Sequence, residues 1–289
     1  MQHDIDTAAR KTKTRKVVSR ICTYTFLIIL TFITVLPFLW MLSGSLQSER
    51  ELFRASLQWI PNPMHWENYS RVVTEIPFAT YFLNTLKIAI IVVFLQVLTS
   101  AMMGYSLAKL EYPGRRIILL FYLSAMMVPF QVIMVPQFLL IKDMGLVNTH
   151  IAIILLQAFS PFGVFLVRQF FMNLPSDLLE AAEIDGAGYI KQFVYIVLPL
   201  GLPALSSLAI RTFIFAMNDF LMPFLYLNDK ALRTIPVGLR SLTTEYSSNY
   251  GMQLAGSTLA LLPVLIVYAF GSNQIINGIS MGGGGSIKG

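Results

Sequence analysis

The chain has 289 residues, of which 55% are hydrophobic and 12% charged, and its mean hydropathy is +0.65. Soluble domains carry about 25% charged residues, so a soluble fold of this length would expose a large apolar surface to water. This composition disfavours a soluble enzyme, a nucleic-acid-binding module and a secreted scaffold. The formal net charge is +6, and its distribution along the chain says more than its size.

The basic residues concentrate in a tail over residues 1–20, ahead of the first apolar stretch. Six of them lie there: Arg10, Lys11, Lys13, Arg15, Lys16 and Arg20. A basic cluster beside an apolar span marks the cytoplasmic side of a membrane more often than a nucleic-acid site, so no nucleic-acid partner is expected. The apolar run that follows is longer than the h-region of about 7–15 residues in a signal peptide. We therefore expect a retained first transmembrane helix.

Six apolar stretches are long enough to cross a bilayer, because a spanning helix needs about 20 residues. We predict helices over residues 21–42, 82–107, 117–141, 149–171, 200–225 and 254–276. The first is followed by a long segment, 43–81, and the other five form a core over 82–276. Another long connection covers residues 226–253, and a Gly-rich tail covers 277–289. Seven prolines in these spans predict kinks and favour a bundle shaped around a pathway.

The balance of Lys and Arg between the connecting segments predicts the orientation. The side of the N-terminus holds twelve: Arg10, Lys11, Lys13, Arg15, Lys16, Arg20, Lys109, Arg115, Arg116, Arg168, Lys191 and Lys288. The other side holds seven: Arg50, Arg54, Arg71, Lys142, Lys230, Arg233 and Arg240. Because cytoplasmic loops carry the excess of basic residues, both termini are predicted to be cytoplasmic and residues 43–81 extracytoplasmic.

Small residues recur at four-residue spacing on two spans, as Ser100, Gly104 and Ala108 and as Gly256 and Ala260. This spacing lets helix backbones approach closely. Contacts within one subunit and a dimer interface are both compatible with it.

Residues that could carry catalysis or hold a metal are scarce. The single Cys22 excludes an internal disulfide, and the three histidines lie far apart. The glycines of Gly282 to Gly285 are not followed by the Gly-Lys-Ser/Thr of a phosphate-binding loop. We expect no catalytic residue, no metal site and no cofactor bound by this chain.

The segment between the fourth and fifth predicted spans, residues 172–199, carries a short helix pattern. Ser176 or Asp177 can cap a helix whose first turn holds Glu180, and Gly186 suits the left-handed residue that ends it. We predict a helix of about two turns on the cytoplasmic surface. A partner could approach its small residues closely, or the helix could lie idle on the lipid headgroups.

The spacing of seven residues in this segment resembles the EAA loop of ABC-transporter importer permeases. They are Glu180, Ala181, Ala182, Gly186, Ile196, Leu198 and Pro199. Residues 112–116, 127–136, 145–149, 218–223, 235–239 and 288–289 are similar to the carbohydrate-uptake, maltose-type branch of that family. The likeness runs from about residue 80 to the end of the chain.

The resemblance implies an all-α membrane protein with six transmembrane helices and the type I ABC importer permease architecture. It implies import of a sugar, such as an oligosaccharide, across the cytoplasmic membrane. The implied partners are a second homologous permease, two ATPase subunits that hold ATP and Mg, an extracytoplasmic solute-binding protein and membrane lipid. A polyamine or peptide cargo is the alternative within the superfamily. A stand-alone secondary transporter or a membrane enzyme fits less well, because ionisable residues are not clustered in the spans.

The resemblance also implies roles for residues of the loop. Glu180 would pair with a basic residue of the ATPase, and Ala181, Ala182 and Gly186 would allow the close fit. Asp185 would also belong to the ATPase-coupling site. The tail from Gly278 to Gly289 would also reach the ATPases, and residues 228–253 would touch the binding protein.

Arg211 departs from the family pattern, in which an apolar residue is more common there, as Met217 departs where Trp is usual. A charge near the middle of a span costs about 3 kcal/mol or more. Arg211 could line the pathway with Asn218 and Asp219, and bind sugar hydroxyls or an anionic sugar. It could also form an ion pair with the partner permease. Asp219 lies about 12 Å along the helix axis, too far for a direct pair.

Overall fold

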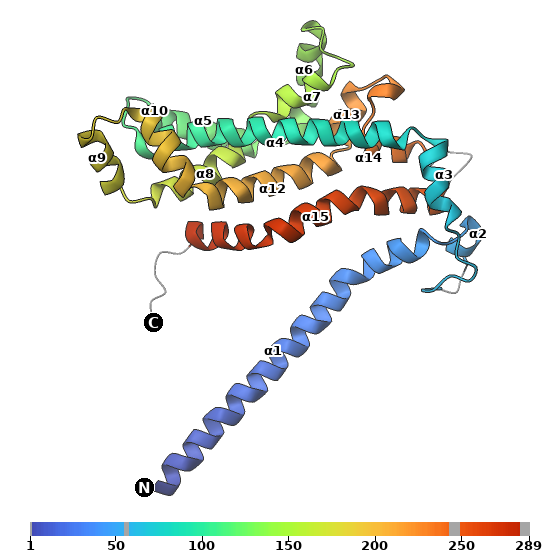
Figure 1. Cartoon of the computed structure of the whole chain (residues 1–289), viewed down its shortest axis with the longest axis horizontal. Coiled ribbons are helices and arrows are strands. Elements are labelled where there is room, and N and C mark those ends of the chain that lie inside the picture. Colours follow the sequence, from blue (N-terminus) through green and yellow to red (C-terminus); the bar gives the residue numbers. More distant parts are fainter. Residues whose placement is uncertain (1, 55–57, 243–248, 284–289) are drawn as a thin grey trace.

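The computed structural model describes the backbone of residues 2–54, 58–242 and 249–283, and the side chains of residues 16–54, 58–242 and 249–272. Every regular element in these residues is a helix (Figure 1), so the predicted all-α fold is confirmed. The predictions for the end of the Gly-rich tail, residues 284–289, lie outside the described residues.

Fifteen α-helices follow one another along the described chain. They are α1 (Gln2–Gly44), α2 (Glu49–Leu52), α3 (Glu67–Glu75), α4 (Phe78–Lys109), α5 (Arg115–Met127), α6 (Phe130–Asp143), α7 (His150–Gln157), α8 (Pro161–Met172), α9 (Asp177–Ile184), α10 (Tyr189–Gln192), α11 (Leu198–Leu200), α12 (Leu202–Asn218), α13 (Leu221–Tyr226), α14 (Ile235–Arg240) and α15 (Tyr250–Gly283). A π-helical turn, η1 (Phe193–Val197), joins α10 to α11, and a 3-10 turn, η2 (Lys230–Leu232), precedes α14.

Four helical segments of the described chain are long and apolar enough to cross a membrane: Lys16–Gly44, Phe78–Lys109, His150–Met172 and Tyr250–Ser272. Two bent helix pairs raise the number to six if each pair is one span. These six segments follow the order of the predicted spans, although the first three are longer at both ends than predicted.

The third predicted span, residues 117–141, is not one straight helix. Its two halves, α5 and α6, meet at an angle of 102°. Pro129 precedes α6 and Val128 is extended, with ψ of 115°. Proline lacks an N–H donor and disfavours a helical residue before it, so the helix breaks there. As a result α6 projects from the bundle (Figure 1).

The fifth predicted span, residues 200–225, is also broken. The pair Tyr189–Leu200 and Leu202–Asn218 bends by 74° at Gly201, so the helical segment begins before the predicted start. A separate short helix, α13, follows after Asp219.

The core of the bundle is α4, which packs against α8 and α12, while α15 packs along α12 (Figure 1). The small residues predicted to let helices approach make contacts within this one chain. A Cβ on Gly104 would lie 3.0 Å from Val167 Cγ1 of α8, and one on Gly256 would lie 2.3 Å from Leu239 Cδ2. The intrasubunit interpretation of both small-residue patterns is therefore the one that these contacts support.

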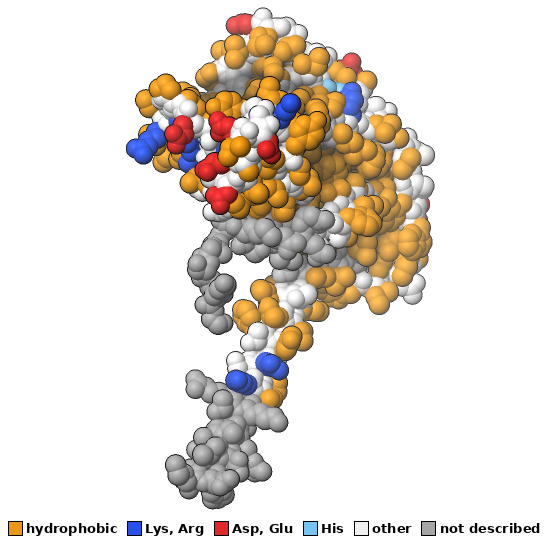
Figure 2. Space-filling view, turned by 60° about the vertical axis from the view of Figure 1, so that its left-hand side comes forward, with side chains coloured by type: hydrophobic (Ala, Val, Ile, Leu, Met, Phe, Trp, Pro, Cys, Tyr) orange, Lys and Arg blue, Asp and Glu red, His pale blue; other side chains and the backbone are white. Residues whose placement is uncertain are grey.

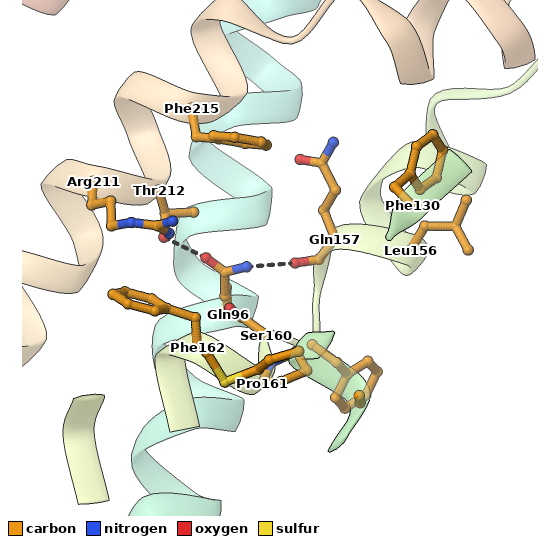
Figure 3. Close-up of a pocket in the computed structure, with 13 residues that line it drawn as sticks. Gln96, Phe130, Leu156, Gln157, Ser160, Pro161, Phe162, Arg211, Thr212 and Phe215 are labelled. Carbon is orange, nitrogen blue, oxygen red and sulfur yellow. Dashed lines mark hydrogen bonds between the residues drawn. The ribbon is translucent and has the colours of Figure 1, made fainter. Parts of the chain in front are cut away.

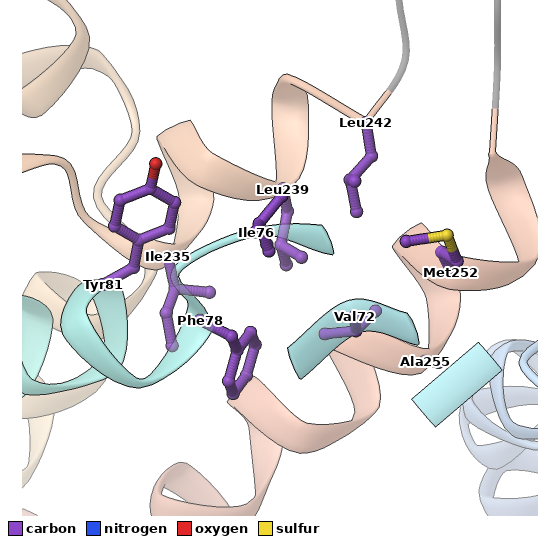
Figure 4. Packing of buried hydrophobic residues seen from close by; sticks show 9 residues of the cluster. All are labelled: Val72, Ile76, Phe78, Tyr81, Ile235, Leu239, Leu242, Met252 and Ala255. Atoms are coloured by element: carbon purple, nitrogen blue, oxygen red, sulfur yellow. The ribbon is translucent and has the colours of Figure 1, made fainter. Parts of the chain in front are cut away.

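An apolar cluster closes the end of the bundle where α3, α14 and the start of α15 meet (Figure 4). Its members are Val72, Ile76, Phe78, Tyr81, Ile235, Leu239, Leu242, Met252 and Ala255. The connection expected over 226–253 is therefore partly folded onto the bundle. Asn84 Nδ2 holds it by hydrogen bonds to the carbonyl oxygens of Ala231 (2.9 Å) and Arg233 (3.0 Å).

Helix α1 diverges from the bundle (Figure 1) and meets α15 only near its C-terminal end. The most apolar stretch of its spanning segment, Lys16–Gly44, has no buried residue. Large apolar side chains such as Phe26, Ile28 and Phe32 are each more than 60% exposed. Lipid or another apolar protein surface is needed to cover them.

Candidate functional site

The predicted loop helix is present as α9, an eight-residue helix at one end of the bundle (Figure 1). None of its residues is buried. It ends as the sequence predicts, because Gly186 has a φ of +80°. Ala187 N donates to Ala182 O at 2.8 Å and Gly186 N to Glu183 O at 2.9 Å, the hydrogen-bond pattern of a Schellman motif.

The start of α9 differs in one respect from the prediction. Ser176 occupies the N-cap position, but its side chain makes no capping hydrogen bond, and its own backbone is helical (φ −70°, ψ −30°). The Ser176 carbonyl accepts from Leu179 N at 2.8 Å and Glu180 N at 3.0 Å. The first turn is therefore closed by main-chain bonds alone.

The loop that carries α9 is fastened to the C-terminal end of α4 on both sides. Lys109 Nζ donates to Leu174 O at 2.6 Å, ahead of the helix. Tyr105 Oη donates to Tyr189 O at 3.4 Å, behind it. Because α4 is the central helix of the bundle, these contacts attach the loop to the core of the fold.

Two arginines cap the C-terminal end of α4. Their side chains donate hydrogen bonds to carbonyl oxygens that have no partner within the helix. Arg115 donates to Leu107 O, Leu110 O and Ala108 O at 2.9, 3.1 and 3.1 Å. Arg168 Nε donates to Leu107 O at 3.1 Å.

Acidic side chains cover the exposed face of α9 and its following turn. Asp177, Glu180, Glu183 and Asp185 are all exposed, and acidic groups gather at this end of the molecule in Figure 2. None of the four forms an ion pair among the residues that the structure describes. Ala181 is exposed and Ala182 half-buried, so the helix offers a narrow acidic tip to a partner.

A pocket of about 530 Å³ with a mostly apolar lining lies between α4, the α5–α6 bend, the α7–α8 break and α12 (Figure 3). It is lined by Gln96, Ala125, Met126, Phe130, Leu156, Gln157, Phe159, Ser160, Pro161, Phe162, Arg211, Thr212 and Phe215. Pockets of about 300–1,000 Å³ with aromatic walls and few polar groups are typical small-molecule sites.

The floor of the pocket is held by a chain of hydrogen bonds. Thr212 Oγ1 donates to Gln96 Oε1, and Gln96 Nε2 donates to Gln157 O at 3.1 Å. Gln157 Nε2 donates in turn to Asp219 Oδ2 at 2.6 Å. Thr99 Oγ1 donates to Ala158 O at 2.7 Å. Side chains of α4 thus satisfy carbonyls freed by the break between α7 and α8, which makes a break in an apolar region tolerable.

Arg211 reaches into this pocket with its Cζ 4.1 Å from the centroid of the Phe162 ring (Figure 3). Among the described residues no carboxylate forms an ion pair with it. Asp219 is not among the residues that line the pocket, and its carboxylate accepts hydrogen bonds from Gln157 Nε2 at 2.6 Å and Met222 N at 3.3 Å. Asn218 is exposed, and its Nδ2 donates to Ile214 O of its own helix at 2.8 Å. Of the three predicted pathway residues, only Arg211 lines the pocket.

Gln96, Gln157, Thr212 and Phe162 were not predicted as site residues. The two glutamines are isolated polar residues within apolar spans, and that feature could have singled them out. The bend and the break that bring them together depend on tertiary packing. Among the described residues no cluster of His, Cys, Asp and Glu could hold a metal ion.

The helix bundle, with its several apolar segments of membrane-spanning length, has the features of a multi-span membrane protein. Residues 96–274 match the family described as "binding-protein-dependent transport system inner membrane component", and the chain belongs to this family. The permease of an ABC importer predicted from the EAA spacing is thereby confirmed.

Named relatives cover nearly the whole chain. The arabinooligosaccharides transport system permease protein AraQ of Halalkalibacterium halodurans is 36% identical over 94% of this chain and 99% of its own length. The diacetylchitobiose uptake system permease protein NgcG of Streptomyces coelicolor is 33% identical over 90% of this chain and 87% of its own. The trehalose/maltose transport system permease protein MalG of Thermococcus litoralis is 31% identical over 92% of this chain and 97% of its own length.

A solved structure supports the fold independently. A chain of a bacterial ABC transporter involved in the import of the acidic polysaccharide alginate superposes with a TM-score of 0.78 at 22% identity, covering 89% of this chain and 96% of that one. The type I importer permease architecture expected from the sequence is therefore confirmed.

Proposed function

We propose that this chain is the permease subunit of an ATP-driven importer of oligosaccharides. The relatives named for arabinooligosaccharides, diacetylchitobiose and trehalose or maltose support a saccharide cargo. The aromatic and amide lining of the pocket is compatible with one, since such a surface can stack on a sugar ring and bond its hydroxyls.

The chain works with a second, homologous permease, two ATPase subunits and an extracytoplasmic solute-binding protein. ATP and Mg are held by the ATPases, which also carry out hydrolysis. The exposed apolar surface of α1 is covered by lipid and by the second permease. Residues 1–20 and the tail 277–289 lie on the cytoplasmic side.

The observation that carries this proposal is α9, an exposed acidic helix fastened to α4. In the proposed complex, α9 enters a cleft of the ATPase, with Glu180 against a basic residue there. Ala181, Ala182 and Gly186 keep the contact close, and Asp185 adds to its negative charge. Closure of the ATPases then moves the spans through the contacts of Lys109 and Tyr105 with the loop.

Substitutions in α9 test this coupling role. A packed contact loses about 1–3 kcal/mol when extra methylene groups are forced into it, so Ala182→Leu should weaken binding of the ATPase. Gly186→Val should do so as well, because valine is strained at a φ of +80°. Glu180→Lys places like charges together and should have the largest effect.

Each variant is measured by co-purification of the ATPase and by oligosaccharide uptake into membrane vesicles. Ala79→Leu is the matched control, because Ala79 is exposed at the opposite end of α4, and it should retain the ATPase. Normal co-purification and uptake in all three α9 variants would show that the helix is an idle surface element.

A further inference from the structure

The charge of Arg211 is not neutralised by any acidic group of the described chain. Charged side chains within membrane spans normally face a cavity or an opposite charge. Here the guanidinium lies at a mostly apolar pocket that also holds Gln96, Gln157 and Thr212, against the face of Phe162. The nearest acid of the hydrogen-bonded floor, Asp219, is engaged by Gln157 and Met222 N. The positive charge is therefore left for something that enters the pocket.

The position of the Arg211 guanidinium over the Phe162 ring restricts what that ligand can be. Stacking on an aromatic ring fixes the plane of a guanidinium while leaving its edge free. That edge carries N–H groups in a fork, which matches the two oxygens of a carboxylate. Arg211 is exposed at the pocket. A neutral hydroxyl would use only part of this fork and would leave the positive charge without a counterion.

The rest of the pocket suits a sugar ring more than a protein side chain. The guanidinium of Arg211 covers one face of Phe162, while Phe215 provides a separate apolar face, and the amide of Gln96 lies between Phe162 and Gln157 (Figure 3). A partner helix bringing a single carboxylate would need close apolar packing around it, whereas this space is open and about 530 Å³ in volume. We propose that the pocket binds an acidic sugar residue, with its carboxylate on Arg211 and its ring against Phe215.

This inference rests on the proposed saccharide cargo and narrows it to oligosaccharides that contain uronic acid units. The neighbouring amide and hydroxyl groups would bond the sugar hydroxyls, while Arg211 would distinguish a carboxylate from the hydroxymethyl group of a neutral sugar. The selectivity lies in the permease and adds to whatever the solute-binding protein selects.

The test is direct binding to the assembled complex of both permeases and the ATPases in lipid nanodiscs, without the binding protein. Two matched pairs of probes are used: methyl glucuronoside with methyl glucoside, and methyl galacturonoside with methyl galactoside. Saturation-transfer NMR gives the dissociation constant of each. The variants are Arg211→Gln and Arg211→Lys, and Arg71→Gln is the control because Arg71 pairs with Glu75 on the exposed surface of α3.

The wild-type complex and the Arg71→Gln control should bind the uronosides about tenfold more tightly than the neutral glycosides, as a charge-assisted hydrogen bond requires. Arg211→Gln should abolish this preference, and Arg211→Lys should keep part of it. Equal binding of both members of each pair by the wild-type complex would overturn the proposal. So would a preference that survives in Arg211→Gln.

Loss of the second permease from Arg211→Gln, with an unchanged preference for uronosides, would assign Arg211 to an ion pair between subunits instead. If none of the four glycosides binds, the pocket is not a sugar site. The importer assignment is judged separately, because binding of the ATPase to α9 and uptake of oligosaccharides do not depend on the carboxylate.

Discussion

Glu51 illustrates how single polar residues order the segment after α1. Its Oε2 accepts hydrogen bonds from Ser48 N at 2.9 Å and from Ser48 Oγ at 2.8 Å. These bonds, the backbone one first, lower the pKa of the Glu51 carboxyl below its usual 4.5. The ionised carboxylate thus closes the first turn of α2.

Because the pKa of Glu51 is lower in the folded state, its contribution to stability has a definite pH dependence. The contribution is complete above the unfolded pKa and is lost as the pH falls through the folded pKa. Thermal unfolding of wild type and Glu51→Gln in detergent should therefore differ most near neutrality, with wild type more stable. The difference should shrink on acidification below about 4.5. A difference that stays constant with pH would show that the ionised form has no special role.

At the scale of helices, the breaks in the spans decide where the site lies. Gln96 and Thr99 of α4 hold the carbonyls freed between α7 and α8, and the pocket forms beside that break. The bend at Gly201 has a different cause, because there the backbone packs directly against the ring of Phe171 and leaves no room for a side chain. A Cβ there would lie 2.4 Å from Phe171 Cε1 and 2.9 Å from Val197 O.

Gly201→Ala should therefore destabilise the bundle by about 1–3 kcal/mol, since neither the ring nor the carbonyl can move freely. Gly188→Ala is the control, because nothing lies within 4 Å of its Cβ position, and it should stay within about 0.5 kcal/mol of wild type. Both are measured by denaturant unfolding of the purified permease. Equal stability of the two variants would mean that the bend relaxes without cost.

At the scale of the whole molecule, the two ends of the bundle differ in character. One end carries α9, and the other carries α2, α3 and α14 with their apolar cluster (Figures 1 and 4). The excess of Lys and Arg on the side of α9 predicts that this end is cytoplasmic.

Cysteine labelling in intact cells tests the orientation, with Cys22→Ser as the background. Glu67→Cys, at an exposed side chain of α3, should react with a membrane-impermeant maleimide. Asn68 is a poor choice for such a probe, because its Nδ2 is buried and donates to Ser45 O and Gln47 O. Ile190→Cys, at a side chain that is 80% exposed, should react only after the membrane is opened. The reverse pattern would invert the proposed topology.

The sequence alone was sufficient for the membrane class, the order of the spans, the helix α9 and the family. Apolar length, charge balance and a left-handed glycine are local properties, and the spacing around Glu180 and Gly186 lies within one loop. The sequence alone could not show that the Ser176 side chain makes no capping hydrogen bond, because capping depends on the backbone conformation of Ser176.

Only the tertiary structure decided where the spans break and what faces the pocket. Pro129 could be read as a kink, but a bend of 102° also depends on what the two helices can pack against. Gln96, Gln157 and Arg211 lie far apart in the sequence and come from three different helices. Their meeting depends on helix packing and on satisfying carbonyls without water, which are properties of the assembled bundle rather than of any one segment.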